Sequence, residues 1–270
     1  MRRDVVVIGA SAGGVEALRT LVTKLPADLP ATILVVLHLP PYGGSVLPAI
    51  LARSGNLPAR HPISGERLSV GTILVAPPDH HLIVDRDRVV LIRGPQENGH
   101  RPAIDVLFRS AARSVGPRAI GVVLSGVLDD GTAGLVAVAS RGGAAIVQDA
   151  QDALYSGMPT SALRHVPDAH VCPAAEIADL LTDLTGEEVE DRGPAPQLME
   201  FETGIAKMDD DAINNPERPG VPSGFSCPDC NGSLWEIREG DLVRYRCRVG
   251  HAWSSESLYG EQSERLDGAL

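Results

Sequence analysis

Short apolar runs alternate with stretches of helical periodicity from the N-terminus to about residue 184. The runs are continuous, as expected of strands in a sheet that is covered on both faces. A turn at Asp85-Arg86-Asp87 splits one of them into a hairpin. The predicted strands are Val5–Ile8, Thr32–Leu37, Ile73–Ala76, His81–Ile92, Ala119–Leu124 and Ala144–Val147, and the predicted helices are Val15–Leu25, Ser45–Ser54, Ile104–Val115, Gly131–Ser140, Thr160–Arg164 and Ala174–Leu184. We therefore predict an α/β fold, a doubly wound and mostly parallel sheet with helices on both faces and an antiparallel hairpin.

The pattern changes after residue 186. Residues 187–222 are rich in acidic residues, Pro, Asn and Gly, which is typical of a mobile linker. Leu198–Met208 is an exception, because its apolar residues could dock onto the main domain. The remaining residues contain three of the four cysteines. We divide the chain into an α/β domain (1–186), an acidic linker (187–222) and a small C-terminal module (223–270).

Composition and charge narrow the class of protein. Of the 270 residues, 43% are hydrophobic and only 3% aromatic, so aliphatic side chains build a substantial core. The net charge is −11, and ten acidic and three basic residues in 187–222 account for −7 of it. Such a chain is not expected to bind nucleic acid or anionic membranes.

The sequence also bears on location. No apolar run approaches the roughly 20 residues that span a bilayer. The run Val5–Ile8 is too short for the core of a signal peptide, which needs about 7–15 residues. We expect a cytoplasmic protein without membrane insertion, and the sequence does not indicate its oligomeric state.

A turn of small residues joins the first predicted strand to the first predicted helix. Gly9-Ala10-Ser11-Ala12-Gly13 has the G-x-S-x-G spacing of a nucleophile elbow, which lifts the serine oxygen clear of the sheet. The serine then lies beside the free N–H groups of a helix N-terminus. Dinucleotide-binding turns look similar, but Ala10-Ser11 stands where the second Gly of G-x-G-x-x-G should fall. By itself, the stretch is compatible with a catalytic serine, a phosphate-binding turn or a plain tight turn.

Polar side chains follow three strands of the predicted sheet. Ser11 follows the first strand, His38 ends the second, and Asp129 and Asp130 follow Ala119–Leu124. These side chains can converge, because ligands of doubly wound sheets meet the carboxyl ends of the strands. A serine, a histidine and an aspartate together permit nucleophilic catalysis, in which the histidine takes the serine's proton and the carboxylate orients the imidazole. Taken singly, the histidine could be structural and the aspartates could cap the helix that follows.

A series of motifs runs collinearly through Val5–Leu184. They are Ile8-Gly9-Ala10-Ser11-Ala12-Gly13-Gly14, His38-Leu39-Pro40-Pro41, Ala76-Pro77-Pro78-Asp79-His80-His81, His100-Arg101-Pro102-Ala103-Ile104-Asp105-Val106-Leu107-Phe108, Leu124-Ser125-Gly126-Val127-Leu128-Asp129-Asp130-Gly131 and Gly157-Met158-Pro159. Together they resemble the catalytic domain of CheB-type protein-glutamate methylesterases. The resemblance implies Ser11 as nucleophile, His38 as general base and Asp130 as orienting carboxylate. It favours Asp130 over Asp129 because the family's acid immediately precedes the glycine.

The resemblance also implies a reaction and a partner. The reaction is hydrolysis of a glutamate γ-methyl ester on a protein, which releases methanol, with glutamine deamidation as a side activity and no cofactor for catalysis. The partner is a methylated chemoreceptor-like or other signalling protein, as in chemotaxis-like signalling. We expect Arg101 either to steer an acidic substrate helix or to pair with Asp105.

The chain departs from the family's pattern in three ways. Gly126-Val127-Leu128 stands where the family often has Gly-Met-Gly, and Ala12 where Thr is common. The chain also begins at the first strand of the catalytic domain. Control by phosphorylation of an N-terminal receiver domain is therefore expected to be absent.

The cysteines of the C-terminal module lie in metal-ligand spacing. Cys227-Pro228-Asp229-Cys230 and Cys247-Arg248-Val249-Gly250-His251 give C-x₂-C and C-x₃-H. Placed at the tips of a hairpin over Leu234–Arg238 and Val243–Arg246, they provide four ligands in a tetrahedron. That set suits a structural Zn²⁺ in a zinc ribbon, with a reduced or redox-active cysteine cluster as the alternative. The predicted ligands are Cys227, Cys230, Cys247 and His251.

The role of this module is open in the sequence. It could recruit a partner, dimerise the chain or cover the esterase site. An amphipathic pattern over Ser254–Leu270, capped by Ser254 or Ser255, predicts a terminal helix and suggests docking.

Three other functions stay open beside the methylesterase. The same fold could serve as a non-catalytic signalling scaffold, or the Gly9–Gly14 turn could bind a nucleotide. The same three residues could also hydrolyse a different ester or an amide.

Overall fold

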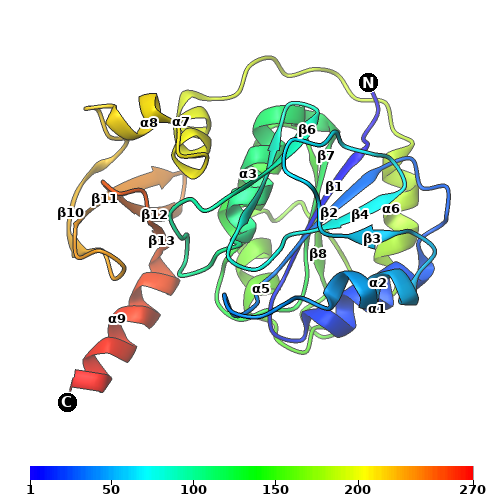
Figure 1. Cartoon of the computed structure of the whole chain (residues 1–270), viewed down its shortest axis with the longest axis horizontal. Coiled ribbons are helices and arrows are strands. Elements are labelled where there is room, and N and C mark those ends of the chain that lie inside the picture. The colour runs from blue at the N-terminus through cyan, green and yellow to red at the C-terminus, as the bar shows by residue number, and fades with distance from the viewer. Residues whose placement is uncertain (270) are drawn as a thin grey trace.

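Five of the predicted strands, together with two short edge strands, pair in parallel at the centre of the α/β domain. They are β1 (Val5–Ala10), β2 (Thr32–Leu37), β3 (Ala59–Arg60), β4 (Thr72–Val75), β7 (Ala119–Val123), β8 (Ala144–Gln148) and β9 (His170–Cys172). In the computed structural model, which describes residues 1–269, their order is β3-β4-β2-β1-β7-β8-β9 and every neighbouring pair is parallel (Figure 1). The chain order reverses between β1 and β7. The carboxyl ends of the central strands therefore border the crevice where such sheets bind ligands.

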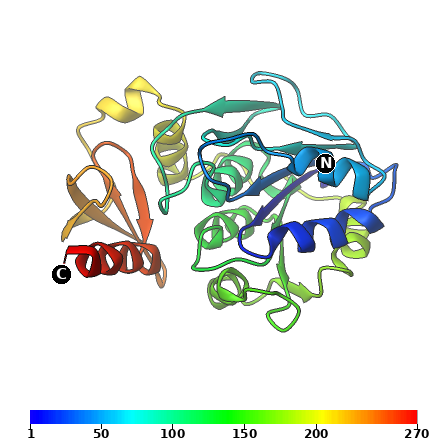
Figure 2. The same cartoon turned by 60° about the horizontal axis from the view of Figure 1, so that its bottom comes forward.

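Helices cover both faces of this sheet (Figure 1 and Figure 2). One layer consists of α1 (Gly14–Lys24), α2 (Leu47–Ser54) and α6 (Ile177–Thr185), and the other of α3 (Ile104–Val115), a 3₁₀ turn (Gly116–Arg118), α4 (Thr132–Ser140) and α5 (Gly157–His165). Along β1, Val6 and Ile8 pack into the first layer, and Val5 and Val7 into the second. Burial on both faces explains why the strands are continuous apolar runs. The predicted fold class is confirmed.

The hairpin is also confirmed. It consists of β5 (His81–Asp85) and β6 (Arg88–Ile92), which form a separate two-stranded sheet and pack against α3. The sequence did not predict the edge strands β3 and β9. They have two and three residues, too few to show the periodicity of a strand.

The acidic segment after α6 contains two helices, α7 (Gln197–Ala206) and α8 (Asp210–Asn214). The chain first crosses the α/β domain (Figure 1), where the Arg141 guanidinium donates hydrogen bonds to the Gly193 and Pro194 carbonyls. Met199 of α7 then joins the apolar core beside α3. The apolar residues of this segment thus dock onto the main domain, and the proposed boundaries at 187 and 223 stay predictions.

The C-terminal module is a small antiparallel sheet with one helix. Its strands are β10 (Val221–Ser226), β11 (Ser233–Glu239), β12 (Leu242–Cys247) and β13 (Ala252–Ser254), in that order, and α9 (Ser255–Ala269) follows. The hairpin of β11 and β12 is the one that the sequence predicts. The Ser257 N–H donates to Ser254 Oγ at 3.0 Å, so Ser254 caps the predicted helix. Leu270, the last residue of that prediction, lies outside the described residues.

A buried cluster of two glutamates and three arginines joins the module to the α/β domain. Glu97, in the loop before α3, accepts hydrogen bonds from Arg109 of α3 at 2.6 Å and from Arg246 of β12 at 2.9 Å. Glu202 of α7 accepts from Arg244 at 2.7 Å and from Arg246 at 2.8 Å. All five side chains are buried. Because buried charges are costly unless they are paired, the cluster fixes β12 against α3 and α7.

Electrostatics keep both glutamates of the cluster ionised. Burial by itself would raise the pKa of each carboxyl. The neighbouring arginines outweigh burial and hold the pKa of Glu97 below, and that of Glu202 well below, the ordinary value.

Neutralising one glutamate of this cluster should destabilise the whole chain. Glu202→Gln leaves Arg244 and Arg246 facing an uncharged amide, and we expect the free energy of unfolding to fall by about 3–5 kcal/mol. Glu261→Gln is the matched control. Its 2.8 Å ion pair with Arg265 is exposed on α9, so its loss should cost less than about 1 kcal/mol. Urea denaturation measures both, and equal effects would contradict the prediction.

Candidate active site

Ser11 lies on a sharp turn between β1 and α1 that only small neighbours permit. The Ser11 N–H donates to the Ser125 carbonyl at 2.9 Å, which fixes the turn against the end of β7. A Cβ on Gly9 would lie 2.2 Å from Ile104. Gly13 has a φ of 73°, and a Cβ there would lie 2.7 Å from Ser125 Oγ. Both glycines of the G-x-S-x-G pattern are thus required by contacts with α3 and with the loop after β7.

The structure brings the three predicted catalytic residues together. His38 follows β2, and its Nδ1 is 3.2 Å from Ser11 Oγ. Its Nε2 is 2.8 Å from Asp130 Oδ2, and the two side chains of this pair are only 7% and 3% exposed. For Nδ1 to accept the proton of the serine, Nε2 must carry the proton that faces the carboxylate. The two ring nitrogens are thus used in the opposite sense to the chymotrypsin template, where Nε2 faces the serine.

Asp130 is a buried carboxylate with hydrogen-bond donors on every side. Oδ2 accepts from His38 Nε2 and, at 2.7 Å, from the Ile104 N–H. Oδ1 accepts from Asn98 Nδ2 at 3.0 Å and from the Asp105 N–H at 3.2 Å. Burial by itself would raise the pKa of Asp130, but the hydrogen bond from His38 and the nearby charges hold it well below its ordinary value. The carboxylate is therefore ionised at neutral pH and lies at the N-terminus of α3, where the helix dipole favours it.

Asp129 faces away from the histidine. Its Oδ1 accepts hydrogen bonds from Ser254 Oγ at 2.7 Å and Ser257 Oγ at 2.9 Å, both in the C-terminal module. Burial raises the pKa of Asp129 to about 6. Of the two adjacent aspartates, Asp130 is therefore the one that contacts His38.

Two further side chains of the site, those of His100 and Asn98, were not predicted from the sequence. The ring of His100 stacks on that of His38, with centroids 3.6 Å apart, and burial lowers the pKa of His100 to about 4. Asn98 donates to Asp130, although its sequence context, Asn98-Gly99, indicates only a turn. His100 occurs in a motif of the resembled family, but nothing in that motif indicates stacking.

One of the two expectations for Arg101, an ion pair with Asp105, is contradicted by its observed partner, and the other, steering of an acidic substrate helix, stays a prediction. Its guanidinium donates to Asp79 Oδ1 at 2.6 Å and not to Asp105. The Asp105 carboxylate instead accepts the N–H groups of Gly131 and Gly134, at 3.0 and 2.7 Å. The expected ion pair between Arg101 and Asp105 is therefore wrong, because Asp105 faces the start of α4.

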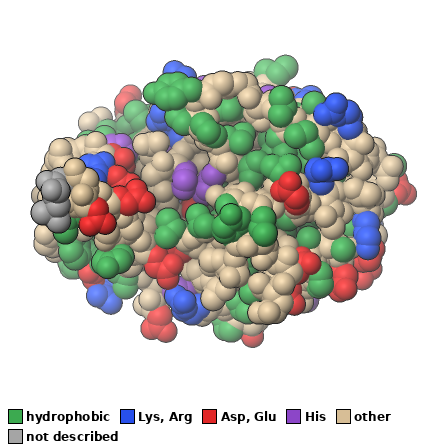
Figure 3. Space-filling model, turned by 90° about the horizontal axis from the view of Figure 1, so that it is seen from below, with side chains coloured by type: hydrophobic (Ala, Val, Ile, Leu, Met, Phe, Trp, Pro, Cys, Tyr) green, Lys and Arg blue, Asp and Glu red, His purple; other side chains and the backbone are tan. Residues whose placement is uncertain are grey.

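The surface around the site is apolar. Figure 3 views this end of the molecule, where histidine side chains lie in a hollow with hydrophobic side chains on both sides. Exposed apolar residues belong to the loops that contact the serine turn: Val127, Leu128, Leu154 and Tyr155. Gly126 immediately precedes Val127 in the chain. It contacts Ser11, since a Cβ on Gly126 would lie 2.9 Å from Ser11 Cβ. A substrate that reaches Ser11 thus meets apolar walls.

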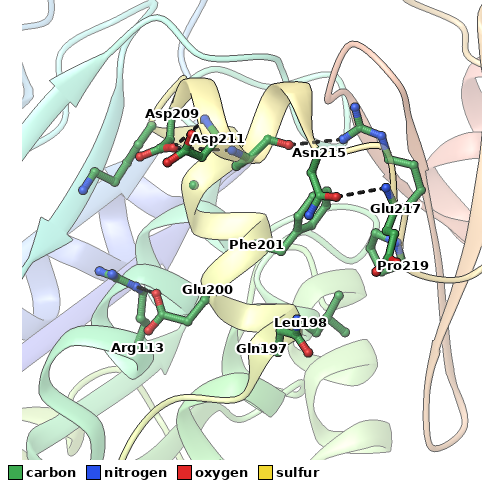
Figure 4. Close-up of a pocket in the computed structure, with 14 residues that line it drawn as sticks. Arg113, Gln197, Leu198, Glu200, Phe201, Asp209, Asp211, Asn215, Glu217 and Pro219 are labelled. Carbon is green, nitrogen blue, oxygen red and sulfur yellow. Dashed lines mark hydrogen bonds and ion pairs between the residues drawn. The ribbon is translucent and has the colours of Figure 1, made fainter.

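A separate cavity of about 570 Å³ lies between α7, α8 and residues 215–219 (Figure 4). Charged residues of both signs line it, among them Arg113, Glu200 and Asp211. None of the three triad residues lines this cavity. It is therefore not where the chemistry of Ser11 takes place.

The four predicted metal ligands also come together. The ligand atoms of Cys227, Cys230, Cys247 and His251 all lie within 4.8 Å of one another. Cys247 Sγ is 3.6 Å from both Cys230 Sγ and His251 Nδ1. Tetrahedral Zn²⁺, with Zn–S of about 2.3 Å and Zn–N of about 2.0 Å, requires separations of about 3.5–3.8 Å. Three thiols and one imidazole at these separations fit a structural zinc ion. The four protein ligands would fill its tetrahedral coordination, so no position would be open to water or substrate.

These observations define an α/β protein with a serine, a histidine and an aspartate at the carboxyl ends of a parallel sheet. Comparison with known proteins is more specific. The family model described as CheB methylesterase matches residues 6–181, and the chain belongs to this family.

Individual relatives match the same region. A protein-glutamate methylesterase/protein-glutamine glutaminase of Symbiobacterium thermophilum is 38% identical over 186 residues, 68% of this chain and 51% of the relative. A Methanosarcina mazei protein of that name, numbered 2, is 37% identical over 190 residues, 67% of this chain and 52% of the relative. The crystal structure of the Thermotoga maritima CheB methylesterase catalytic domain superposes with a TM-score of 0.65 at 32% identity, covering 68% of this chain and all of that one. The chain thus spans about half the length of the curated relatives it matches.

One further finding concerns membranes. Within residues 1–269, no helix combines the length and the apolar character needed to cross a bilayer.

The pKa of Asp129 predicts a pH-dependent stability. In the unfolded chain, Asp129 has the ordinary pKa of 3.8, whereas in the folded chain its pKa is about 6. As the pH rises, the unfolded chain therefore loses this proton first. The stability contributed by the protonated form is therefore lost as the pH rises from about 4 to about 6. Asp129→Asn removes this ionisation and can still accept both serine hydroxyls. Relative to wild type, its free energy of unfolding should rise by about 2 kcal/mol between pH 4 and pH 7, as measured by urea denaturation at both pH values. A pH-independent difference would contradict the prediction.

Proposed function

We propose that this chain is a serine hydrolase that demethylates glutamate γ-methyl esters of a signalling protein. The observation that carries the proposal is the continuous hydrogen-bonded series from Ser11 Oγ through His38 to the ionised Asp130. The names of the curated relatives support the same activity, and they add glutamine deamidation as a second one.

The first half of the reaction transfers the acyl group to the serine. Ser11 Oγ attacks the ester carbonyl while His38 Nδ1 takes its proton, and Asp130 stabilises the resulting imidazolium. The N–H groups of Ala12 and Val127 make no hydrogen bond within the described part of the chain, so they can bind the tetrahedral oxyanion. Val127 needs only its backbone N–H for this role. Having Val where the family often has Met therefore does not remove this contact to the oxyanion. His38 then protonates the departing methanol.

The second half of the reaction restores the enzyme. His38 takes a proton from a water molecule, which attacks the acyl-enzyme carbonyl and releases the free glutamate side chain. The same groups act on a glutamine side chain, with ammonia in place of methanol as the leaving group. No step requires a metal or an organic cofactor.

The apolar walls support a protein substrate. A methylated glutamate is uncharged, and the exposed residues Val127, Leu128 and Leu154 can pack against the apolar face of the helix that carries it. A methylated chemoreceptor-like protein is a partner with this chemistry.

Removing the nucleophile should abolish the reaction without unfolding the chain. For Ser11→Ala, we expect release of labelled methanol from a methylated receptor-type protein to fall by about 10⁶-fold, and for Asp130→Asn by about 10⁴-fold. Ser140→Ala is the control, because that hydroxyl only bonds the Ala137 carbonyl on α4. Methanol release by Ser11→Ala at the wild-type rate would disprove the proposed nucleophile.

A serine-reactive fluorophosphonate separates the alternatives. Labelling of Ser11 without methanol release would identify a hydrolase with a different ester or amide substrate. Failure to label wild type would favour the non-catalytic scaffold.

We propose further that Cys227, Cys230, Cys247 and His251 hold a structural Zn²⁺. The purified chain should contain one zinc ion, measured by elemental analysis. Cys230→Ser should lose most of it, whereas Cys172→Ser, which alters the cysteine on β9, should retain it. A metal content that is unaffected by Cys230→Ser would contradict the assignment.

A further inference from the structure

We infer that Asn98 is a positioning residue for the triad carboxylate and that the metal-binding module holds Asn98 in place. Metal at the Cys₃His cluster then sets the reactivity of Ser11. This inference rests on the proposed role of the triad.

The side chain of Asn98 uses both ends of its amide. Its Nδ2 donates to Asp130 Oδ1 at 3.0 Å and to Asp105 Oδ2 at 3.1 Å. Its Oδ1 accepts the Ser254 N–H at 2.8 Å. Asn98 is buried and has a φ of 52°, a left-handed conformation that Asn tolerates better than most residues. The amide thus bridges the triad carboxylate and the backbone of β13.

The backbone of β13 fixes the Asn98 loop at two more points. The Asn98 N–H donates to the Ala252 carbonyl at 2.8 Å, and the Ala252 N–H donates to the Gln96 carbonyl at 3.2 Å. Gly99 is the next residue along, and the Trp253 ring covers it, since a Cβ there would lie 3.5 Å from that ring. The position of Asn98 therefore depends on the register of β13.

The cluster of metal ligands in turn controls that register. His251 immediately precedes β13, and Cys247 ends β12. The turn between them closes with the Cys247 N–H donating to the His251 carbonyl at 3.0 Å, and both side chains face the other two ligands. A module with so small a core depends on its metal for folding. Loss of the metal thus releases the turn, then β13, and then the hydrogen bond from Ser254 to Asn98.

Loss of Asn98 would weaken the hydrogen bonding of Asp130. Without Asn98, its Oδ1 keeps one donor, the Asp105 N–H, and the carboxylate can turn away from His38. A hydrogen bond to a charged group contributes enough for its loss to slow the reaction of Ser11 by about 10–100-fold. Because the Asn98 side chain is buried and bonds Asp130 rather than Ser11, its removal should lower the maximal rate and leave binding unchanged.

The test compares Asn98→Ala, Cys247→Ser, the double variant and the control Cys172→Ser, all as full chains purified in the presence of zinc. Saturation kinetics of fluorophosphonate labelling give the maximal rate, the half-saturating concentration and the labelled fraction. Hydrogen exchange of the Ile104 and Asp105 amides, the two backbone donors to Asp130, reports on the carboxylate independently of activity. Elemental analysis gives the metal content.

We expect Asn98→Ala and Cys247→Ser each to lower the maximal rate by about 10–100-fold at unchanged half-saturation, and only Cys247→Ser to lose metal. Both should speed exchange at Ile104 and Asp105, whereas Cys172→Ser should match wild type. Since both changes act through one residue, the double variant should react no more slowly than Cys247→Ser.

Three results would overturn the inference. The first is a metal-free Cys247→Ser whose labelling rate and amide exchange match wild type. The second is a double variant whose loss of rate equals the sum of the two single losses. The third is a lower labelled fraction at an unchanged rate, which indicates simple unfolding. If wild type is not labelled, the proposed function fails, and the exchange of Ile104 and Asp105 with and without metal decides the inference by itself.

Discussion

The site depends on one constraint, the burial of the charged Asp130 carboxylate. A carboxylate away from water is tolerated only when its oxygens are hydrogen-bonded, and here the donors come from three separate parts of the chain. His38 arrives at the end of β2, Ile104 and Asp105 supply the first turn of α3, and Asn98 lies in the loop between them. The parallel sheet makes this convergence possible because its strands end at one edge. The order of the strands thus determines the chemistry that the edge can perform.

The second organising interaction is the buried cluster of glutamates and arginines. It contains one residue from α3, one from the preceding loop, one from α7 and two from β12, so it connects the α/β domain, the acidic segment and the C-terminal module. Ion pairs of this kind add little net stability compared with apolar packing, but removing one partner is costly. Each pair requires its partner in place, so the cluster favours the orientation of the C-terminal module that brings both arginines of β12 onto the two glutamates.

Much of this architecture follows from the sequence. The apolar pattern predicts the long strands, the hairpin and the helices of the α/β domain, because burial leaves a clear periodicity, whereas α7 and α8 were expected only as part of a linker with a docking segment. Ser11, His38 and the pair Asp129 and Asp130 could be singled out because each follows a strand and the fold class brings strand ends together, whereas only the resemblance favoured Asp130 over Asp129. The metal ligands have a spacing that no ordinary helix or strand requires.

The remaining features depend on tertiary packing that leaves no local pattern. Asn98 looks like a turn residue, and its function comes from the module that packs on it from more than 150 residues away. The partner of Arg101 is Asp79 because Asp105 is already used by the start of α4. The resemblance assigns the triad but says nothing of the module, which lies outside the matched region.

The adjacent carboxylates Asp129 and Asp130 point in opposite directions from one loop. Asp130 is held by the α/β domain and by Asn98, and Asp129 is held by Ser254 and Ser257 at the start of α9. Both carboxylates are nevertheless linked to one residue of the module, Asp129 through the Ser254 hydroxyl and Asp130 through Asn98, which accepts the Ser254 N–H. A displacement of Ser254 would therefore disturb a hydrogen bond of Asp129 and, through Asn98, one of the hydrogen bonds that hold Asp130 against His38.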